Sequence, residues 1–308
     1  MPNYHALTSA LGFAASNVVV VGGTAGIGAA IGVRFAELGA SVLIVGRNQK
    51  AGDEVVGQMK KGSTREDAKL EFLRKDLGSV EEIKAAVEDI AVWAGDAGVH
   101  YLVQSQGGPA SGMVSSPMTV EALTTGFNVQ ILSHFLIPYL LLSRPEPVLR
   151  KGAQICNIAR PGEKGRTIDM DDFYYLKATE AGKFKLFPNV FSFVFMLDLL
   201  AHEFNIRFPD THTTHIYPGA VATGIFQHTN LPWWIRVAAP VLLFFAQSAA
   251  SYANVLVWQI GSDEAKALKR TYWDQYSREV DVDQRVWNDT QLREGVWEKL
   301  MHYGGVRA

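Results

Sequence analysis

The stretch VVVVGGTAGIG at residues 18–28 decides how this chain folds. Four consecutive valines predict a strand that is buried on both faces. Beyond the glycines, apolar side chains recur at the spacing of a helix, and Gly39 stands where such a helix would end. These apolar residues are Ile27, Ile31, Phe35 and Leu38. The pattern therefore predicts a strand, a tight turn and a helix whose N-terminus faces the end of the strand.

Each glycine of this turn has a physical reason to be there. Gly22 allows the sharp turn, Gly26 lets the backbone approach a pyrophosphate, and Gly28 lets the helix pack closely on the sheet. The free N–H groups and the positive end of the helix dipole then favour a phosphate. A glycine-rich loop can also be a structural turn, but its place directly after an apolar strand favours a bound dinucleotide.

The composition narrows the classes of function. The chain has 308 residues, of which 48% are hydrophobic, enough for the core of one large α/β domain. Its formal charge is −2 and no basic block is present, so we expect no nucleic-acid partner. The single cysteine, Cys156, excludes an intramolecular disulfide framework and fits a reducing, cytoplasmic compartment. Residues 1–15 lack the basic and apolar regions of a signal peptide.

Strands and helices alternate along most of the chain. This alternation predicts a doubly wound parallel sheet with right-handed crossovers, and ligands at the carboxyl ends of its strands. No repeat or linker divides the chain, so we expect a single domain over 1–308, with a core over about 17–224 and a lid and appendage over about 225–308. The expected strands are 18–21, 41–45, 70–73, 99–103, 152–158 and 213–217, and the later helices are 49–61, 80–93, 120–142 and 190–204.

Two later segments need separate interpretations. Residues 237–262 carry no formal charge and are long enough to suggest a membrane span. Polar residues interrupt them, however, so two buried amphipathic helices broken near Gln247 are the better interpretation, and a membrane-facing surface is the alternative. Residues 263–308 are charged and rich in tryptophan, which predicts a helical surface appendage.

Over residues 17–224 the chain resembles the short-chain dehydrogenase/reductase family, whose domain is a Rossmann-type fold. The motifs that carry the resemblance are the loop Gly22–Gly28, the pair Asp76–Leu77, the segment QSQG at 104–107 and the segment PGAVAT at 218–223. The segment DLLA at 198–201, followed by YPG at 217–219, looks most like fungal members linked to natural-product pathways. The resemblance implies that these loops bind a nicotinamide dinucleotide. The implied contacts are Gly22, Thr24, Gly26, Ile27, Gly28, Arg47, Asn48, Asp76, Leu77, Ser105, Gly107, Gly219, Val221 and Thr223.

The residue after the second strand informs the choice of cofactor. An acidic side chain there would bind a ribose 2′-hydroxyl and repel a 2′-phosphate. This chain has Arg47, followed by Asn48, and a guanidinium suits a phosphate. We therefore expect NADP(H) rather than NAD(H), although Arg47 can also be read as an ordinary surface arginine.

The catalytic positions of the family hold other residues in this chain. The family pairs a tyrosine with a lysine four residues later, and uses a serine after the fifth strand and an asparagine in the long helix. None of the ten tyrosines has a lysine four residues on. Alignment on DLLA puts Leu186 and Val190 at the tyrosine and lysine positions, Arg160 at the serine position and Gln130 at the asparagine position, with Asn128 nearby. The usual acid–base group is therefore expected to be missing.

Substitute catalytic groups are expected between residues 160 and 185. Arg160 could stabilise an oxyanion, or could pair with Glu163 or Asp169. Tyr174 could supply a phenol, or could simply pack, and Lys183 is a third candidate that could also be a solvated surface charge. His134 is expected to be structural, and no metal site is expected because His212 and His215 have no carboxylate at ligand spacing.

Three functions are compatible with these residues. The first is an NADP(H)-dependent reductase or dehydrogenase with a displaced proton donor. The second is a non-redox isomerase, dehydratase or cyclase, with or without bound NADP, and the third is a non-catalytic cofactor-binding protein. Apolar residues after Gly219, including Trp233 and Trp234, favour a hydrophobic, polyketide-like substrate. The apolar helices at 120–142 and 190–200 suggest a homodimer or homotetramer.

Overall fold

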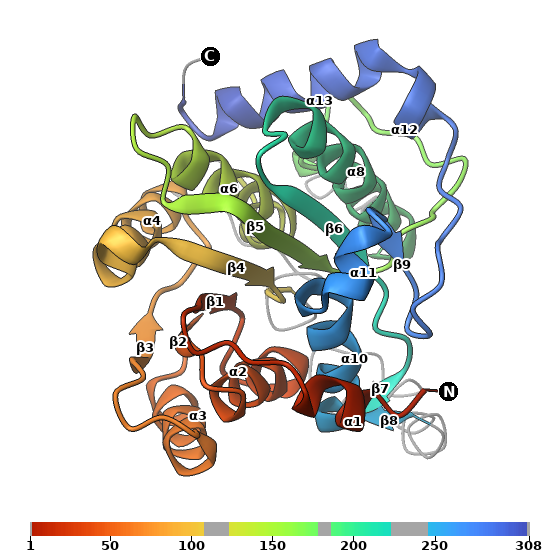
Figure 1. Ribbon diagram of the computed structural model, residues 1–308. Coiled ribbons are helices and arrows are strands. Elements are labelled where there is room, and N and C mark those ends of the chain that lie inside the picture. Colours follow the sequence, from red (N-terminus) through yellow and green to blue (C-terminus); the bar gives the residue numbers. More distant parts are fainter. Residues whose placement is uncertain (1, 108–122, 178–185, 223–245, 307–308) are drawn as a thin grey trace, which may run out of the picture.

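A seven-stranded parallel sheet forms the centre of the computed structural model, which describes residues 2–107, 123–177, 186–222 and 246–306 (Figure 1). The strand order is β3-β2-β1-β4-β5-β6-β9. The chain thus runs outward from β1 to β3, returns beside β1, and runs outward again. The predicted doubly wound sheet in one domain is confirmed. Its strands are β1 (Asn17–Val21), β2 (Ser41–Gly46), β3 (Leu70–Arg74), β4 (Val99–Gln104), β5 (Leu149–Ile158), β6 (His212–Ile216) and β9 (Tyr272–Trp273).

Helices cover both faces of the sheet, and the valines of β1 explain why (Figure 1). Successive side chains of a strand point to opposite faces. Val18 and Val20 therefore join one hydrophobic core, whereas Val19 and Val21 join the other. The first core lies under α2 (Gly26–Glu37), α3 (Gln49–Gly62) and α10 (Ala249–Gly261). The second lies under α4 (Val80–Ala94), α6 (Ser133–Leu142), α8 (Leu186–Arg207) and α13 (Thr290–Tyr303).

The long helix predicted over 120–142 has three parts in its described portion. The part α5 (Thr125–Phe127) leads into the π-helical turn η3 (Asn128–Leu132), and α6 follows. Pro138 lies inside α6. The stretch Thr125–Leu142 is the one described helix that is long and apolar enough to cross a membrane, with a mean hydropathy of 1.3, but 78% of it is buried within the fold. It is a core helix of the α6 layer.

The uncharged segment 237–262 is described only from residue 246 onward. Strand β8 (Gln247–Ser248) pairs with β7 (Val221–Ala222), and α10 follows with Ser248 as its N-cap. Tyr252 and Leu256 of α10 are fully buried against the α2 side of the sheet. The second of the two predicted buried helices is therefore present, and residues 237–245 lie outside the described residues.

The interpretation of residues 263–308 as a surface appendage is wrong. Tyr272 and Trp273 form β9, the seventh strand of the sheet, and pair with His215 and Ile216. Helix α13 then packs on α6 and α8, where Trp297 and Leu300 are buried. The error has a physical reason: a two-residue strand has no periodicity, and charged residues separate the short apolar pairs Val296–Trp297 and Leu300–Met301 of α13. Shorter elements here are α11 (Asp263–Ala267) and α12 (Arg285–Asn288), and the 3₁₀ turn η1 (Gly95–Ala97) follows α4.

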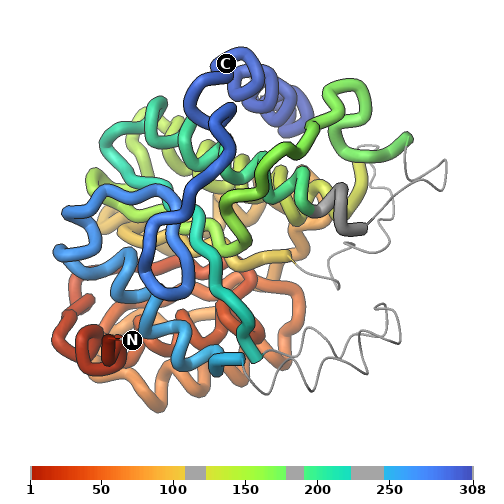
Figure 2. The backbone as a smooth tube through the Cα atoms, turned by 90° about the vertical axis from the view of Figure 1, so that its right-hand side faces the viewer, coloured from red at the N-terminus to blue at the C-terminus, as the bar shows by residue number. Residues whose placement is uncertain are grey.

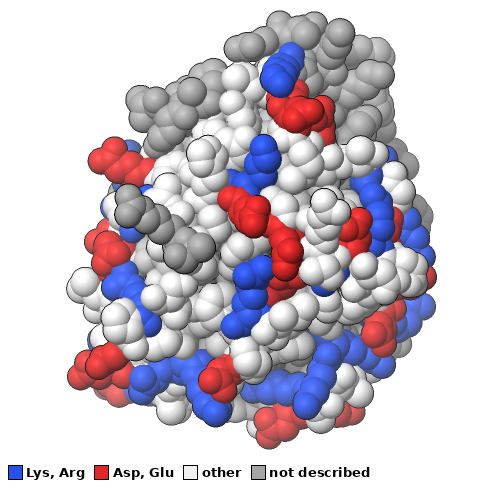
Figure 3. All heavy atoms as spheres, turned by 90° about the horizontal axis from the view of Figure 1, so that it is seen from above, with Lys and Arg blue, Asp and Glu red and all other residues white. Residues whose placement is uncertain are grey.

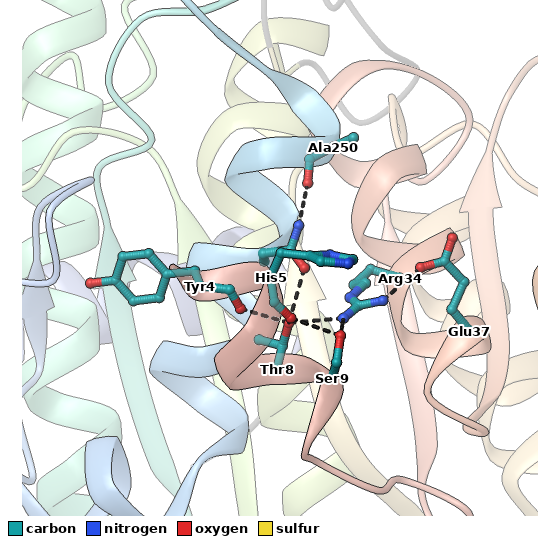
Figure 4. A network of polar contacts seen from close by, with 8 residues as sticks. Tyr4, His5, Thr8, Ser9, Arg34, Glu37 and Ala250 are labelled. Carbon is teal, nitrogen blue, oxygen red and sulfur yellow. Dashed lines mark hydrogen bonds and ion pairs between the residues drawn. The ribbon is translucent and has the colours of Figure 1, made fainter. Parts of the chain in front are cut away.

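The first helix of the chain is attached by side-chain hydrogen bonds. Helix α1 (Tyr4–Ser9) lies beside α10 and α2 (Figure 4). The Thr8 hydroxyl donates to Asn254 Oδ1 at 2.9 Å and accepts from the Arg34 guanidinium at 2.9 Å. Arg34 is buried and also donates to Ser9 and Glu37. Figure 2 shows that α1 and the C-terminal helix α13 lie on opposite sides of the sheet.

Acidic and basic side chains are interspersed over the surface. Figure 3 shows both signs across the face that is seen from above. Much of this charge lies in close pairs, such as Lys164 with Asp281 at 2.5 Å and Arg144 with Glu88 at 2.5 Å.

Candidate functional site

The glycine turn after β1 is built so that larger residues do not fit. Gly22 has a φ of +78°, and a Cβ added to it would lie 2.6 Å from the backbone nitrogen of Gln106. A Cβ on Gly28 would lie 2.4 Å from the carbonyl oxygen of Gly22. The loops after β1 and β4 are also joined directly, because the Ser105 N–H donates to the Val21 carbonyl at 2.9 Å. The turn, the helix and the neighbouring strand therefore touch backbone to backbone.

The N-terminus of α2 is available for an anion. Gly26 has a φ of +56° and begins the helix, and the N-cap residue Ala25 makes no side-chain hydrogen bond to the first turn. Helix N-terminal N–H groups without a cap need another partner, and phosphate is a common one. Ile27 is partly exposed beside them, and Thr24 packs on Gly46, where an added Cβ would lie 2.6 Å from Thr24 Cγ2. This cradle fits the pyrophosphate of a dinucleotide.

The residues expected at the adenosine end meet at the ends of β2 and β3. Arg47 Nη1 lies 4.0 Å from Asp76 Oδ2, and both side chains are largely exposed. Asp76 Oδ1 also accepts from the Gly78 N–H at 3.1 Å, and Leu77 is buried beside it. Asn48 caps α3, because its Oδ1 accepts from the Ala51 N–H at 3.1 Å. A guanidinium, a carboxylate and an apolar side chain thus stand together where the expected adenosine would lie.

The loop after β4 contacts the π turn of the long helix. Gly107 has a φ of +147°, and a Cβ added to it would lie 2.9 Å from Gln130 Oε1. The amide of Gln130 therefore lies against the loop that holds Ser105 and Gly107. Asn128 contacts a different loop, the one after β3, because its Nδ2 donates to the Gly78 carbonyl at 2.8 Å. π-helical turns inside helices are frequent at functional sites, which agrees with this position beside the candidate site.

The loop after β6 has the same dependence on glycine. Gly219 has a φ of +70°, and an added Cβ would lie 2.9 Å from Gln275 Cγ, a residue that follows β9. Val221 lies in β7 and is buried, and the Gln247 N–H donates to the Ala220 carbonyl at 3.1 Å. Thr223 lies outside the described residues.

Arg160 stands where the chain leaves β5 for the site. Its guanidinium carbon lies 5.8 Å from the ring centre of Tyr217, which follows β6, and 5.8 Å from that of Phe191 in α8. The predicted pairing with Glu163 is present, with Nε 3.5 Å from Oε1. The Arg160 side chain is nevertheless 57% exposed, although it follows directly after the carboxyl end of β5. It can still stabilise an anionic oxygen there.

The other two catalytic candidates are placed differently. The ring of Tyr174 is partly buried, packs against the hydrophobic core under α6, and lies 5.9 Å from the ring of Phe127 and 5.3 Å from that of Tyr303. This position matches the alternative in which Tyr174 packs. Lys183 lies outside the described residues, and of Leu186 and Val190 only the backbone is described, at the start of α8.

Beneath the open edge of the sheet lies a row of buried polar side chains that the sequence reasoning did not connect. Gln104, Asn157 and His215 are direct neighbours across β4, β5 and β6. Gln104 Nε2 donates to Asn157 Oδ1 at 2.7 Å, and His215 Nδ1 lies 2.8 Å from Asp198 Oδ1. Asp198 was the available signal, since an acidic residue inside an apolar helix requires a buried partner.

Burial changes the acid–base properties of the groups around this row. Burial, with a smaller contribution from the charge of His215, lowers the pKa of His134 on α6 to about 3. Burial also raises the pKa of the Cys156 thiol to about 12, so this cysteine is not a nucleophile at neutral pH. The described residues contain no group of three or more histidine, cysteine or acidic side chains that could hold a metal ion.

Comparison with known proteins agrees with this architecture. Residues 16–161 match the family model for short chain dehydrogenases. An uncharacterized oxidoreductase of Schizosaccharomyces pombe is 30% identical over 239 residues, which cover 77% of this chain and 59% of that protein. The chain thus spans less than two thirds of that relative. Polyprenol dehydrogenase of Mus musculus is 25% identical, over 82% of this chain and 74% of its own length.

Solved structures share the fold. An uncharacterized protein of Mycobacterium paratuberculosis superposes with a TM-score of 0.71 at 17% identity, over 97% of each chain. The angucycline C-6 ketoreductase LanV, solved with bound NADP, superposes with a TM-score of 0.57 at 17% identity, over 84% of this chain and 93% of its own. The chain is therefore similar to short chain dehydrogenases over residues 16–161, and it shares the fold of these solved structures over most of its length.

Proposed function

We propose that this chain is an NADP(H)-dependent reductase or dehydrogenase that acts on a carbonyl or hydroxyl group of a hydrophobic substrate. One observation carries the proposal. The glycine cradle at the uncapped start of α2 and the guanidinium of Arg47 at the end of β2 lie on the same edge of the sheet. The first suits a pyrophosphate and the second a 2′-phosphate. The NADP bound to LanV supports the same choice of cofactor.

The cofactor supplies the hydride when it is bound, so the protein must orient the substrate and stabilise charge. Arg160 is the group that we assign to the second task. It stands at the end of β5 beside Tyr217, and its guanidinium remains charged at neutral pH. A charged donor next to a developing oxyanion lowers the barrier to hydride transfer. The aromatic residues expected in the lid, around Trp233 and Trp234, favour a polycyclic or polyketide-like substrate.

Proton delivery is the unusual part of the proposal. Glutamine, arginine, leucine and valine at the four family positions do not act as acids at neutral pH. We therefore propose a non-standard donor, with Tyr174 and Lys183 as the candidates in the chain and bulk water as the further source. Loss of a positioned acid costs about 10²–10⁴-fold in rate, so we expect a slow enzyme with ordinary ketones.

The same four residues support a second candidate, a non-redox isomerase, dehydratase or cyclase in which bound NADP shapes the pocket. In that case Arg160 polarises the substrate oxygen without hydride transfer. A non-catalytic cofactor-binding protein is the third candidate. Product formation with NADP⁺ bound, and no change in nicotinamide absorbance, would favour the second candidate over the first.

The test begins with binding and continues with turnover. Titration of the purified chain with NADPH and with NADH, followed by tryptophan fluorescence, should show tighter binding of NADPH. Consumption of NADPH should then be measured with menadione, acenaphthenequinone and progesterone as hydrophobic carbonyl probes. Equal affinity for the two nucleotides would contradict the choice of cofactor. NADPH binding with no turnover of any probe would contradict the reductase proposal and favour the alternatives.

A further inference from the structure

The feature that carries a further inference is a buried carboxylate–imidazole pair. Asp198 of α8 and His215 of β6 are both fully inaccessible to solvent, and Asp198 Oδ1 lies 2.8 Å from His215 Nδ1. Transfer of a carboxylate out of water is costly, even with a partner, and a well-packed apolar pair would often be more stable. A buried pair of this kind is therefore more easily explained by what it holds in place than by its contribution to stability.

The second oxygen of Asp198 reaches out of the pair to the loop after β5. Asp198 Oδ2 accepts the Gly162 N–H at 3.0 Å. Gly162 has a φ of +93°, and a Cβ added to it would lie 2.8 Å from Val280 Cγ1. The loop at this point is therefore held between a buried carboxylate on one side and the segment after β9 on the other.

Gly162 lies two residues after Arg160, the group to which we assign the substrate oxygen. Glu163 follows at once, is itself buried, and binds the guanidinium of Arg160 at 3.5 Å and that of Arg166 at 2.9 Å. Arg160 has a long side chain with four rotatable bonds, and its charged head is mostly exposed. Its position over Tyr217 and Phe191 consequently depends on where the backbone of residues 160–163 is held.

Residues of neighbouring strands also contact the pair or the residue beside it. The Tyr272 hydroxyl of β9 donates to the backbone carbonyl of Asp198 at 2.8 Å. The amide of Gln104 bonds Asn157, the neighbour of His215 in the sheet. The pKa of Asp198 is raised, chiefly by burial, and the hydrogen bond with His215 opposes this shift. His215 and the Gly162 N–H thus orient the two oxygens of the carboxylate, Tyr272 holds the backbone of the same residue, and the side chain is fully inaccessible to solvent.

We propose that Asp198 is a positioning residue for Arg160. Its carboxylate, oriented by His215, anchors the loop after β5 through the Gly162 N–H, and this anchor presents the Arg160 guanidinium at the edge of the sheet between β5 and β6. The inference rests on the proposed function, because it concerns the residue that would face the substrate oxygen. In this role neither Asp198 nor His215 needs to touch the substrate.

Hydrogen–deuterium exchange tests the anchor without any assumption about activity. In the full-length Asp198→Ala variant, peptides that cover residues 159–166 should exchange about tenfold faster, the effect of losing a hydrogen bond to a charged acceptor. Asp198→Asn keeps an oxygen for the Gly162 N–H and should stay within about threefold of wild type. Asp210→Ala is the matched control, since Asp210 is 70% exposed and pairs with Lys151. Unchanged exchange at 159–166 in Asp198→Ala would overturn the inference.

Kinetics then test whether the anchor acts through Arg160. With NADPH and the best carbonyl probe of the panel, kcat/KM should fall about 10- to 100-fold in Asp198→Ala, and NADPH affinity should stay unchanged. In an Arg160→Leu background, Asp198→Ala should cost nothing further, because its only route to the substrate is already gone. Additive losses in the double variant would mean a merely structural role and would overturn the inference.

Two further variants guard against a folding failure. If Asp198→Ala does not fold, His215→Leu removes the orienting partner and should speed exchange at 159–166, whereas His215→Asn retains a donor to Asp198 and should not. Equal exchange in these two variants would count against the anchor. A wild-type chain that binds NADPH but reduces no probe contradicts the proposed function alone, since the exchange experiment still decides whether Asp198 anchors the loop.

Discussion

The two halves of the functional edge of the sheet are built by different means. In the half after β1, β2 and β3, glycines shape the loops, as where a Cβ on Gly28 would meet the carbonyl oxygen of Gly22 and a Cβ on Gly22 would meet the backbone of Gln106. In the half after β5 and β6, several partners of the loop after β5 lie more than a hundred residues away in the chain. Lys164 pairs with Asp281, the Gly165 N–H donates to Asp283, and Arg285 donates to the Arg166 carbonyl.

This difference shows where the molecule can be altered and where it cannot. The nucleotide half, which comprises the loops after β1, β2 and β3, depends on backbone conformation. A Cβ added to Gly22 would lie 2.6 Å from the Gln106 nitrogen, and one added to Gly46 would lie 2.6 Å from Thr24 Cγ2. The substrate half, which comprises the loops after β5 and β6, depends on packing of the last fifty residues against β6 and α8. Its shape can therefore change when distant residues change, whereas the nucleotide half is set mainly by backbone contacts among the loops at the ends of β1, β2 and β4.

The largest effect is expected from Trp297, which holds the C-terminal helix on the substrate half. Its ring lies 4.8 Å from that of Phe135 and 5.1 Å from that of Phe204, and the side chain is buried. Trp297→Ala should lower the free energy of unfolding by about 3–5 kcal/mol, because it leaves a cavity between α13, α6 and α8. Urea denaturation monitored by circular dichroism measures this loss.

Trp287 is the matched control for this substitution. It is 43% exposed and touches only the rings of His202 and Tyr272 among the described aromatic residues. Trp287→Ala should cost about 1 kcal/mol, in the range of ordinary substitutions near the surface. Similar losses of unfolding free energy in Trp297→Ala and Trp287→Ala would contradict a structural role for α13, which would then be the surface appendage that the sequence suggested.

The next largest effect is expected at Gly22 in the nucleotide half. Gly22→Ala forces an L-residue to a φ of +78° and brings a Cβ to 2.6 Å from the Gln106 backbone. The conformation alone costs about 1–2 kcal/mol, and the displaced backbone adds to it. NADPH affinity, measured by fluorescence titration, should fall at least about tenfold.

Gly57 supplies the control for this glycine. It lies in α3, and no atom is within 4 Å of a Cβ added to it. Gly57→Ala should raise the free energy of unfolding by about 0.5–1 kcal/mol, because alanine favours the helix, and should leave NADPH affinity unchanged. An unchanged NADPH affinity in Gly22→Ala would show that the turn is not a cradle for the pyrophosphate.

Arg47 sharpens the comparison, since it is the side chain that we assign to the 2′-phosphate. Arg47→Leu should weaken NADPH binding by about 1.5–3 kcal/mol, the range for hydrogen bonds to charged groups, and leave NADH binding unchanged. Isothermal titration calorimetry with both nucleotides measures the two affinities. Arg150→Leu, at an exposed arginine near the start of β5, is the control and should change neither. Equal weakening of both nucleotides would contradict a specific phosphate contact.

The smallest effect is expected from the titration of His134 beside the buried polar row. Burial lowers its pKa from 6.5 to about 3. Below pH 6.5 the unfolded chain therefore binds a proton that the folded chain does not, and the free energy of unfolding falls as the pH falls. The loss is about 1.4 kcal/mol per pH unit, or about 2 kcal/mol between pH 7 and pH 5.

Urea denaturation at both pH values measures this loss. His134→Gln should reduce the pH dependence by that amount, whereas His5→Gln, at an exposed histidine, should leave it unchanged. An unaltered pH dependence in His134→Gln would mean that water reaches the row and that this part of the substrate half is not dry.

Much of the fold followed from local patterns. Short apolar runs bounded by turns predicted β1 to β6 to within a few residues, and Ser79 caps α4 by accepting the Glu82 N–H at 3.2 Å. Strand β9 was missed, since two residues have no period. The dimer seam predicted from the helices at 120–142 and 190–200 stays a prediction, but α13 packs on both of these helices in the described structure.

The residues of the candidate site also fall into those that a local sequence pattern identified and those that only the structure brought together. The cradle residues were identified from glycines at fixed spacing, because only glycine reaches these backbone conformations at no cost. Gln130 beside Gly107, Gln275 beside Gly219, and Asp198 with His215 were not identified as neighbours. Their separations in the chain range from 17 to 56 residues, and no local pattern relates residues across such loops.

The sequence alone determined the chain order of β1 to β6 and of the helices between them, the glycine turn after β1 and the arginine that follows β2. These features depend on periodicity and on backbone conformations that a few adjacent residues dictate. The tertiary structure alone decided that the last fifty residues complete the sheet, and that a buried carboxylate and a distant segment hold the loop of Arg160. Those features depend on contacts between residues far apart in the chain, which exist only once the sheet has brought its strands together.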